Sequence, residues 1–187
     1  MENLLQYLHS IHPLSPGLYE HLYDILRVKE LSKKDFLLRA GHISRSICFI
    51  NKGLLRCFYI KDDTEVCSWF MKEGDVIVSV ESFFLQKPSY ENIQALEDCE
   101  VFYIDYSQLQ HIYQHFPEFN FIGRVVTEKY YALSEQRLYA LRMQRSHERY
   151  AYLMAHSPEL IQRVPSKYLA SYLGITDVTL SNIKSKI

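Results

Sequence analysis

The sequence lacks several features that would decide its class at once. Its 187 residues include one tryptophan, six glycines and six prolines, and 21 lysines and arginines nearly balance 22 aspartates and glutamates. A net charge of −1 excludes a protein that coats nucleic acid through a general basic surface. No apolar run approaches the length of a membrane span, and the first residues lack the charged-then-apolar order of a secretory signal. We therefore expect a cytoplasmic protein with no membrane partner.

Metal and redox motifs are also missing. Cys48, Cys57, Cys67 and Cys99 form no CxxC pair, and each lies in an apolar, strand-like stretch. This predicts buried, reduced thiols and excludes an iron–sulfur cluster, which needs closely spaced thiolates. The histidines at positions 111 and 115 have the spacing of a helical metal pair, but no further ligand has a matching spacing. We interpret them as solvent-facing, and we expect no cofactor and no bound metal.

Catalytic motifs are absent as well. The chain contains no GxSxG, no Walker loop and no HExxH. A cupin enzyme is the small β-barrel alternative, but it would need several histidines and glutamates clustered on its strands. Of eight histidines, only His42 falls in the β-rich region. We therefore expect a protein that is not an enzyme.

Apolar periodicity divides the chain into helical and β-rich stretches. Residues 2–29 predict two short helices, and Ser15-Pro16 supplies an N-cap and a first-turn proline for the second. Residues 30–104 contain short β-branched and aromatic runs separated by turn residues, which is typical of a closed antiparallel sandwich or barrel. The runs are ICFI, LLRCFYI, EVCSWFM, VIVSV, ENIQAL and EVFYI.

A second helical region follows the β-rich stretch. Residues 105–113 predict a short helix capped by Asp105, and residues 117–145 predict a long helix of roughly 27 residues, or about 40 Å. Because a small β domain cannot cover that length, we expect one stripe to form a dimer interface with a second copy. The alternative is a helix that lies wholly on its own β domain. The stripe consists of Phe119, Ile122, Val126, Tyr130 and Leu133.

Residues 164–187 have the pattern of two capped helices. Ser166 is a candidate cap for the first helix, Gly174 permits a left-handed turn, and Thr176 is a candidate cap for the second helix, whose apolar face includes Ile187. Such a pair is either a packing hairpin or a DNA-binding helix-turn-helix, in which the second helix lies in the major groove. The candidate DNA-binding residues are Ser166, Lys167, Thr176, Asp177, Thr179, Ser181, Asn182, Lys184 and Lys186.

The string LASYLGIT-xx-TLS-x-I-xx-KI resembles the helix-turn-helix of Crp/Fnr-type transcription regulators, especially the short members without a C-terminal wing. Gly41, Gly53 and Gly74-Asp75 fall at the turn glycines of that family, so the resemblance covers essentially the whole chain. It implies an α+β fold with three parts. They are a cyclic-nucleotide-binding-like β-roll (a double-stranded β-helix of jelly-roll type) with flanking helices over residues 1–116, a dimerisation helix over 117–145, and a helix-turn-helix domain over 146–187.

The resemblance implies a homodimeric regulator that binds double-stranded DNA and a small-molecule effector of unidentified chemistry. The chain departs from the family in its second helix, where Asn182 replaces an arginine that contacts guanine and Asp177-Val178 replaces an early Arg/Pro-Glu pair. Asparagine can bond adenine, but an aspartate repels phosphate. A second hypothesis is therefore a ligand-sensing protein that has lost specific DNA binding and acts through protein contacts.

The effector pocket departs from the family too. Cyclic-nucleotide binders of this family hold the ribose and the cyclic phosphate with a Gly-Glu-Leu segment and an Arg-Ser pair. Here the corresponding segments are 78–83 and 90–92, where the arginine is missing and Glu91 adds negative charge. We therefore expect that cyclic AMP does not bind, and that the pocket holds another small molecule or is empty. The expected lining is Ser79, Glu81, Ser82, Tyr90 and Asn92, with Tyr131, Ser134 and Glu135 from the long helix.

Overall fold

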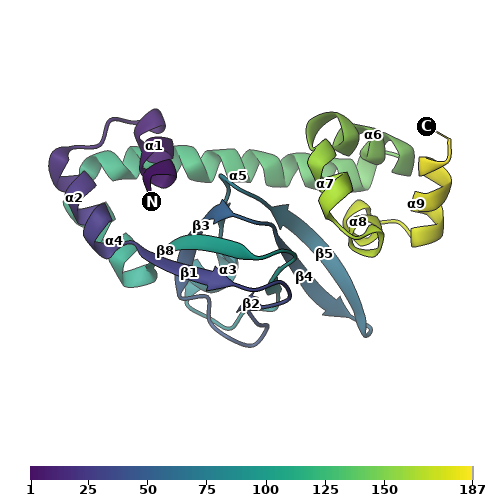
Figure 1. Cartoon of the computed structure of the whole chain (residues 1–187), viewed down its shortest axis with the longest axis horizontal. Coiled ribbons are helices and arrows are strands. Elements are labelled where there is room, and N and C mark those ends of the chain that lie inside the picture. The colour runs from purple at the N-terminus through teal and green to yellow at the C-terminus, as the bar shows by residue number, and fades with distance from the viewer. Residues whose placement is uncertain (187) are drawn as a thin grey trace.

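The computed structural model describes residues 1–186, so Ile187 lies outside the described residues. Figure 1 shows the long helix α5 running along the molecule, with a β-roll beneath its middle and smaller helices gathered at each end. The helices are α1 (Glu2–Ile11), α2 (Pro16–Ile25), α3 (Val80–Leu85), α4 (Tyr106–His115), α5 (Pro117–Met143), α6 (Ser146–His156), α7 (Pro158–Arg163), α8 (Ser166–Leu173) and α9 (Asp177–Lys184). The strands are β1 (Arg27–Leu31), β2 (Phe36–Leu38), β3 (Ser46–Lys52), β4 (Leu55–Lys61), β5 (Thr64–Met71), β6 (Val76–Ile77), β7 (Asn92–Ala95) and β8 (Cys99–Asp105).

The β-roll consists of two four-stranded antiparallel sheets, in the orders β1-β8-β3-β6 and β2-β7-β4-β5. The prediction of an antiparallel sandwich is confirmed. The β4–β5 hairpin closes through Asp62 and Asp63, which both have positive φ (48° and 57°), as a tight hairpin turn requires. One apolar cluster fills the roll, and all four cysteines are buried and free, as expected. The cluster includes Ile50, Leu55, Ile77, Ile93 and Val101.

Two boundaries in the first half of the chain differ from the prediction. The second N-terminal helix ends at Ile25 rather than near residue 29, because Arg27 begins β1 and pairs with Tyr103 of β8. The run VIVSV is a strand only over Val76–Ile77, and its last residue begins α3. An apolar run of five residues fits a strand and a helix equally well, so periodicity alone could not separate them.

The helices after the β-roll follow their predicted caps closely. Asp105 is the N-cap of α4, and its backbone N–H donates to Gln108 Oε1 at 2.8 Å. The histidines at 111 and 115 are exposed, as expected. Helix α5 has 27 residues, and within residues 1–186 no helix has both the length and the apolar character needed to cross a bilayer.

The stripe predicted as a dimer interface faces the chain's own β-roll and N-terminal helices instead. Phe119 is 7% and Ile122 1% exposed within the N-terminal core, and Val126 packs against the same cluster. The hydroxyl of Tyr130 accepts the backbone N–H of Val76 at 2.7 Å. Phe119 and Ile122 are therefore covered by the chain itself and cannot contact a second copy, which corrects the prediction for these two residues, whereas Leu133 is 36% exposed. The exposed apolar side chains of α5 are Phe121, Tyr131, Leu133, Leu138, Tyr139, Leu141 and Met143.

The C-terminal helices pack on the β-roll. Ser171 of α8 accepts the backbone N–H of Cys67 at 2.9 Å and donates to the carbonyl of Glu65 at 3.1 Å, which fixes α8 on β5. A single apolar cluster joins strand residues to helix residues across this contact. The cluster includes Leu54, Phe58, Phe70, Tyr150, Leu153, Leu169, Leu173 and Leu180.

Candidate nucleic-acid interface and ligand cavities

Helices α8 and α9 form an angled pair joined by a short turn. Gly174 ends α8 with φ 66°, and Thr176 caps α9 by accepting the backbone N–H of Thr179 at 3.2 Å, as the sequence predicts. The expected cap Ser166 is instead the first residue of α8, and Pro165 occupies the N-cap position without a side-chain hydrogen bond. A capping side chain accepts the N–H of the second or third helical residue from the position before the helix, and Ser166 lies one position too late for this role.

The outward face of α9 is polar and accessible. Leu180 is 1% exposed and anchors the helix on α8, whereas Asp177, Ser181 and Asn182 are exposed on the other side. Thr179 is half-buried, and its hydroxyl lies 2.9 Å from that of Thr176. Leu180 and the partly buried Ile183 therefore hold α9, while its exposed side, which also includes Val178, stays open to a partner.

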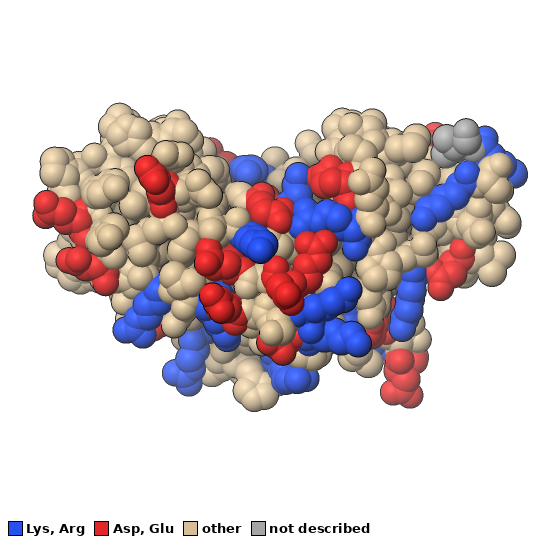
Figure 2. All heavy atoms as spheres, in the orientation of Figure 1, with Lys and Arg blue, Asp and Glu red and all other residues tan. Residues whose placement is uncertain are grey.

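Basic side chains flank this face. Lys184 Nζ lies 3.4 Å from Ser166 Oγ, which brings the end of α9 beside the start of α8. Lys167 and Lys186 are exposed on the same pair of helices. Figure 2 shows basic atoms over the C-terminal helices and mixed charges over the centre of this view. The predicted DNA-binding residues thus gather on one helix pair, with three lysines and one aspartate among them.

The segments expected to bind the effector, 78–83 and 90–92, which we call the effector cassette, have polar side chains that are hydrogen-bonded within the chain. Ser79 and Ser89 are buried with their hydroxyl oxygens 3.0 Å apart, and Ser82 Oγ accepts the backbone N–H of Ser44 at 2.9 Å. The side-chain oxygen of Asn92 accepts the backbone N–H of Ala40 at 3.0 Å. These polar atoms therefore already have partners within the chain.

The remaining expected lining residues are spread over the surface. Glu81 forms an ion pair with Lys87, and Tyr90 is exposed and packs against Tyr59. Burial raises the pKa of the nearby Glu91 carboxyl, against a hydrogen bond with Ser79 that lowers it. The long-helix candidates Tyr131, Ser134 and Glu135 are all exposed, and only Glu135 lines the large cavity described next.

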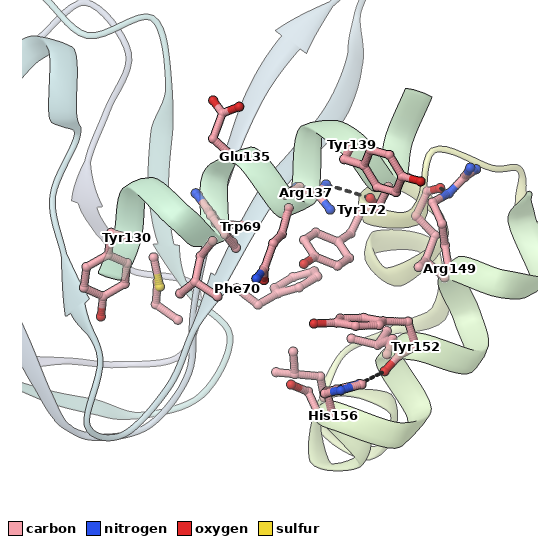
Figure 3. Close-up of a pocket in the computed structure, with 18 of the residues that line it drawn as sticks. Trp69, Phe70, Tyr130, Glu135, Arg137, Tyr139, Arg149, Tyr152, His156 and Tyr172 are labelled. Carbon is pink, nitrogen blue, oxygen red and sulfur yellow. Dashed lines mark hydrogen bonds between the residues drawn. The ribbon is translucent and has the colours of Figure 1, made fainter. Parts of the chain in front are cut away.

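A large cavity lies between the β-roll and the C-terminal helices, and we call it the junction cavity. Its volume is about 880 Å³, and β5, α5, α6 and α8 all contribute to its wall. Figure 3 shows Trp69 and Tyr130 on one side, Tyr152 and His156 on the other, and Glu135 pointing away from the group. The lining residues include Trp69, Phe70, Tyr130, Arg137, Tyr139, Gln144, Arg149, Tyr152 and Tyr172.

Two arginines of this wall hold the end of α8. Arg137 Nη2 donates to the carbonyl of Tyr172 at 2.7 Å, and Arg149 Nε donates to that of Leu173 at 2.8 Å. Cations at a helix C-terminus satisfy the last carbonyls and interact favourably with the helix dipole. The Arg137 guanidinium also lies over the Tyr172 ring at 3.6 Å, and burial lowers the pKa of Arg137.

Ion pairs connect the C-terminal helices to the β-roll. The sequence analysis did not predict the charged residues that form them. Arg163 of α7 forms ion pairs with Glu73 (2.9 Å) and Glu97 (2.7 Å), and we call this group the α7 clamp. Arg56 on β4 is buried and pairs with Glu65 at 2.7 Å. The one signal in the sequence was a charged residue inside the apolar run LLRCFYI, because a buried arginine needs partners.

Residues 28–116 match the family model described as the cyclic nucleotide-binding domain. No curated protein sequence matches the chain. Among solved structures, the chain is similar to the c-di-GMP responsive global regulator CLP of Xanthomonas campestris, with 16% identity, a TM-score of 0.72, and 92% of this chain and 91% of that chain covered. It is also similar to FixK2 of Bradyrhizobium japonicum, with 16% identity, a TM-score of 0.73, and coverage of 87% and 84%.

A mutant of CooA from Carboxydothermus hydrogenoformans is similar at 20% identity, with a TM-score of 0.72 and coverage of 98% and 83%. At these identities the likeness shows the fold. Residues 28–116 therefore match the cyclic nucleotide-binding domain, and the chain shares its fold with these three proteins.

Proposed function

We propose that this chain is a homodimeric, DNA-binding transcription regulator of the Crp/Fnr type that senses a small molecule other than cyclic AMP. The observation that carries the proposal is the outward face of α9, where Ser181 and Asn182 are exposed while Leu180 anchors the helix. A helix held by one side and polar on the other has the shape that enters a major groove.

In this proposal the three parts of the chain have separate roles. Residues 1–116 sense the effector, residues 117–145 join two copies, and residues 146–187 contact DNA. The N-terminal residues of α9 meet base edges, and Lys167, Lys184 and Lys186 meet phosphates. Two helix pairs related by the dimer axis then contact half-sites about one helical turn apart.

A mobility-shift assay with promoter fragments from the cognate genome, repeated over a range of salt concentrations, tests the DNA half. Asn182→Ala should weaken binding to the preferred fragment by about 1–3 kcal/mol, because an asparagine amide that bonds a base edge is worth about that much. Gln162→Ala, an exposed change on α7, is the matched control and should leave affinity unchanged. If no fragment binds specifically, the DNA half of the proposal fails.

The exclusion of cyclic AMP follows from the closed cassette. The serine hydroxyls there are bonded within the chain, and the half-buried Glu91 would face the cyclic phosphate. Like charges in a half-buried site repel strongly. Isothermal titration calorimetry should show no binding, and a micromolar dissociation constant for cyclic AMP would overturn this part.

The second candidate function is a ligand sensor that acts through protein contacts. Asp177 favours it, because an exposed carboxylate in the first turn of α9 would repel phosphate. Asn182→Arg separates the two candidates. Under the second one, this change raises DNA affinity from a negligible level while the oligomeric state stays the same.

A further inference from the structure

The wall of the junction cavity contains two arginines, Arg137 and Arg149, that form no ion pair with the carboxylates of residues 1–186. Within these residues, both arginines donate hydrogen bonds only to backbone carbonyls. The cavity's other cation, Lys72, is already paired with Glu159. A half-buried guanidinium gains most from a charged acceptor, so this end of the cavity favours an anion.

The two carboxylates of the cavity wall lie elsewhere. Asp75 accepts the backbone N–H of Lys72 at 3.0 Å and lies 3.5 Å from the hydroxyl of Tyr130, at the β-roll end. Glu135 is exposed and points away from the other labelled side chains in Figure 3. Neither forms an ion pair with the two arginines.

Aromatic rings form much of the remaining wall. Tyr172 packs on Phe70 with ring centroids 5.1 Å apart, and Tyr152 stacks on His156 at 3.9 Å. Trp69 completes this lining from β5. Flat rings on several sides of a cavity favour a flat aromatic ligand, because offset and edge contacts between rings add to the burial of apolar area.

One polar atom of the wall has no hydrogen-bond partner among the described residues. Within residues 1–186, the one buried side-chain polar atom that lacks a hydrogen-bond partner is Gln144 Oε1, and Gln144 lines this cavity. Buried polar atoms are nearly always satisfied, so a solvent or ligand group is expected beside it.

We propose that the junction cavity binds a planar aromatic ring that carries one carboxylate or phosphate, with the anion between Arg137 and Arg149 and the ring against the aromatic side chains of the wall, Trp69 and Tyr139 among them. We further propose that this cavity is the effector site, a step that rests on the proposed function. A ligand there touches both the β-roll and α8, so its binding energy depends on how the two are placed.

Calorimetry on the full chain with synthetic probes tests the site directly. Naphthoate and naphthyl phosphate supply the ring with each anion, naphthalenemethanol supplies the ring with an uncharged hydroxyl group, and inorganic phosphate supplies an anion alone. We expect at least one of the two aromatic anions to bind at least about tenfold more tightly than either partial probe, because a charge-assisted hydrogen bond is worth 1.5–3 kcal/mol. Equal affinity for naphthoate, naphthyl phosphate and naphthalenemethanol would overturn the proposal.

Variants locate the probe. Arg137→Gln and Tyr139→Ala change the cavity wall and should weaken the aromatic anion about tenfold or more. Arg142→Gln and Tyr23→Ala are matched controls, since Arg142 on α5 and Tyr23 on α2 are exposed and lie outside the wall. Equal losses in wall and control variants, or no binding to dimeric protein because a second copy's long helix fills the cavity, would also overturn the proposal.

The effector step has its own readout. Saturating the cavity with the tighter aromatic anion should change the affinity for a specific promoter fragment at least about fivefold, the lower end of ordinary allosteric coupling. Unchanged DNA affinity with a filled cavity refutes the effector step alone. If no fragment binds but the probe still discriminates wall from control variants, the proposed function fails and the ligand site stands.

Discussion

At the scale of single residues, Arg56 is a buried charge with partners on several sides. It is 1% exposed, donates to Gln94 at 2.6 and 3.0 Å, and pairs with Glu65 at 2.7 Å. Its guanidinium lies between the rings of Phe58 and Tyr168, at 3.9 and 3.7 Å. It therefore joins β4, β5, β7 and α8 through one side chain.

Arg56→Ala should lower the free energy of unfolding by about 3–5 kcal/mol, because removing one partner of a buried pair leaves the other polar groups without compensation. Urea unfolding followed by circular dichroism measures the change. The control is Arg124→Ala, which breaks an exposed pair with Glu128 within α5 and should cost about 0.5 kcal/mol. Equal losses in the two variants would contradict the role of Arg56.

Two glycines with similar backbone angles give a second prediction at this scale. Gly53 has φ +98°, and a Cβ there would lie 2.5 Å from Cys99 Sγ and 2.7 Å from the carbonyl of Asp98. Gly41 has φ +85° but nothing within 4 Å of the same position. Gly41→Ala should therefore cost about 1–2 kcal/mol from backbone strain alone, and Gly53→Ala a further 1–3 kcal/mol or so from overpacking.

Thermal unfolding of both variants gives the comparison. Backbone strain costs nearly the same free energy in both variants. If the two variants lose the same stability, the close contact of Gly53 with Cys99 and Asp98 adds no cost and the prediction is wrong.

At the scale of elements, the α7 clamp joins a short helix to two loops of the β-roll. Arg163 donates to both oxygens of Glu73 and to both oxygens of Glu97. Glu73 also accepts the backbone N–H of Gly53 at 2.8 Å. The hydrogen bond from Arg163 lowers the pKa of Glu73 to about 2, against desolvation.

The folded pKa of Glu73 lies below its ordinary value of about 4.5, so the undocked state takes up the proton first. The clamp's contribution is therefore complete above about pH 4.5 and is lost as the pH falls toward 2. Fluorescence of Trp69, which lines the junction cavity, should report the release of the C-terminal helices over this range. Glu73→Gln keeps an acceptor for Gly53 but should weaken docking at neutral pH and flatten the acid dependence.

Glu128→Gln is the control for this titration, because its ion pair lies within α5 and is exposed. Coincident acid curves for wild type and Glu73→Gln would show that the clamp does not hold the helices.

Elements whose signals are local could be predicted from the sequence. The caps at Ser15, Asp105 and Thr176 and the left-handed turn at Gly174 depend on residues within a few positions of each other, and the structure has all four. The hidden face of α5 could not be predicted, because which stripe is covered depends on distant packing.

The effector cassette shows the same limit at a candidate site. No local signal in the sequence indicates that its serines have hydrogen-bond partners, but Ser82 Oγ accepts the backbone N–H of Ser44, which is 38 positions away. The junction cavity was missed for a similar reason, since Trp69, Arg137 and Tyr172 come from three separate elements. Side chains that meet only through the tertiary fold leave no periodic signal.

At the scale of the whole molecule, α5 presents apolar side chains that the chain itself does not cover. Phe121, Tyr131, Leu138 and Leu141 are each more than 40% exposed along one helix. Figure 1 shows that α5 extends across the molecule beyond the β-roll. A long helix with an uncovered apolar stripe gains free energy by pairing with its copy, which places the proposed dimer interface on this stripe rather than on the buried one.

Leu138→Glu should shift the dimer to monomer, because a charge at the centre of a helix pair loses its hydration without gaining a partner. Leu138 is 44% exposed and does not line the junction cavity, so the fold and the ligand site should be retained. Val28→Glu places the same charge on β1 at a side chain that is 50% exposed and should leave the mass unchanged. Light scattering after size exclusion measures both. If Leu138→Glu stays dimeric, the two copies meet elsewhere, and the α9 helices are not spaced by α5.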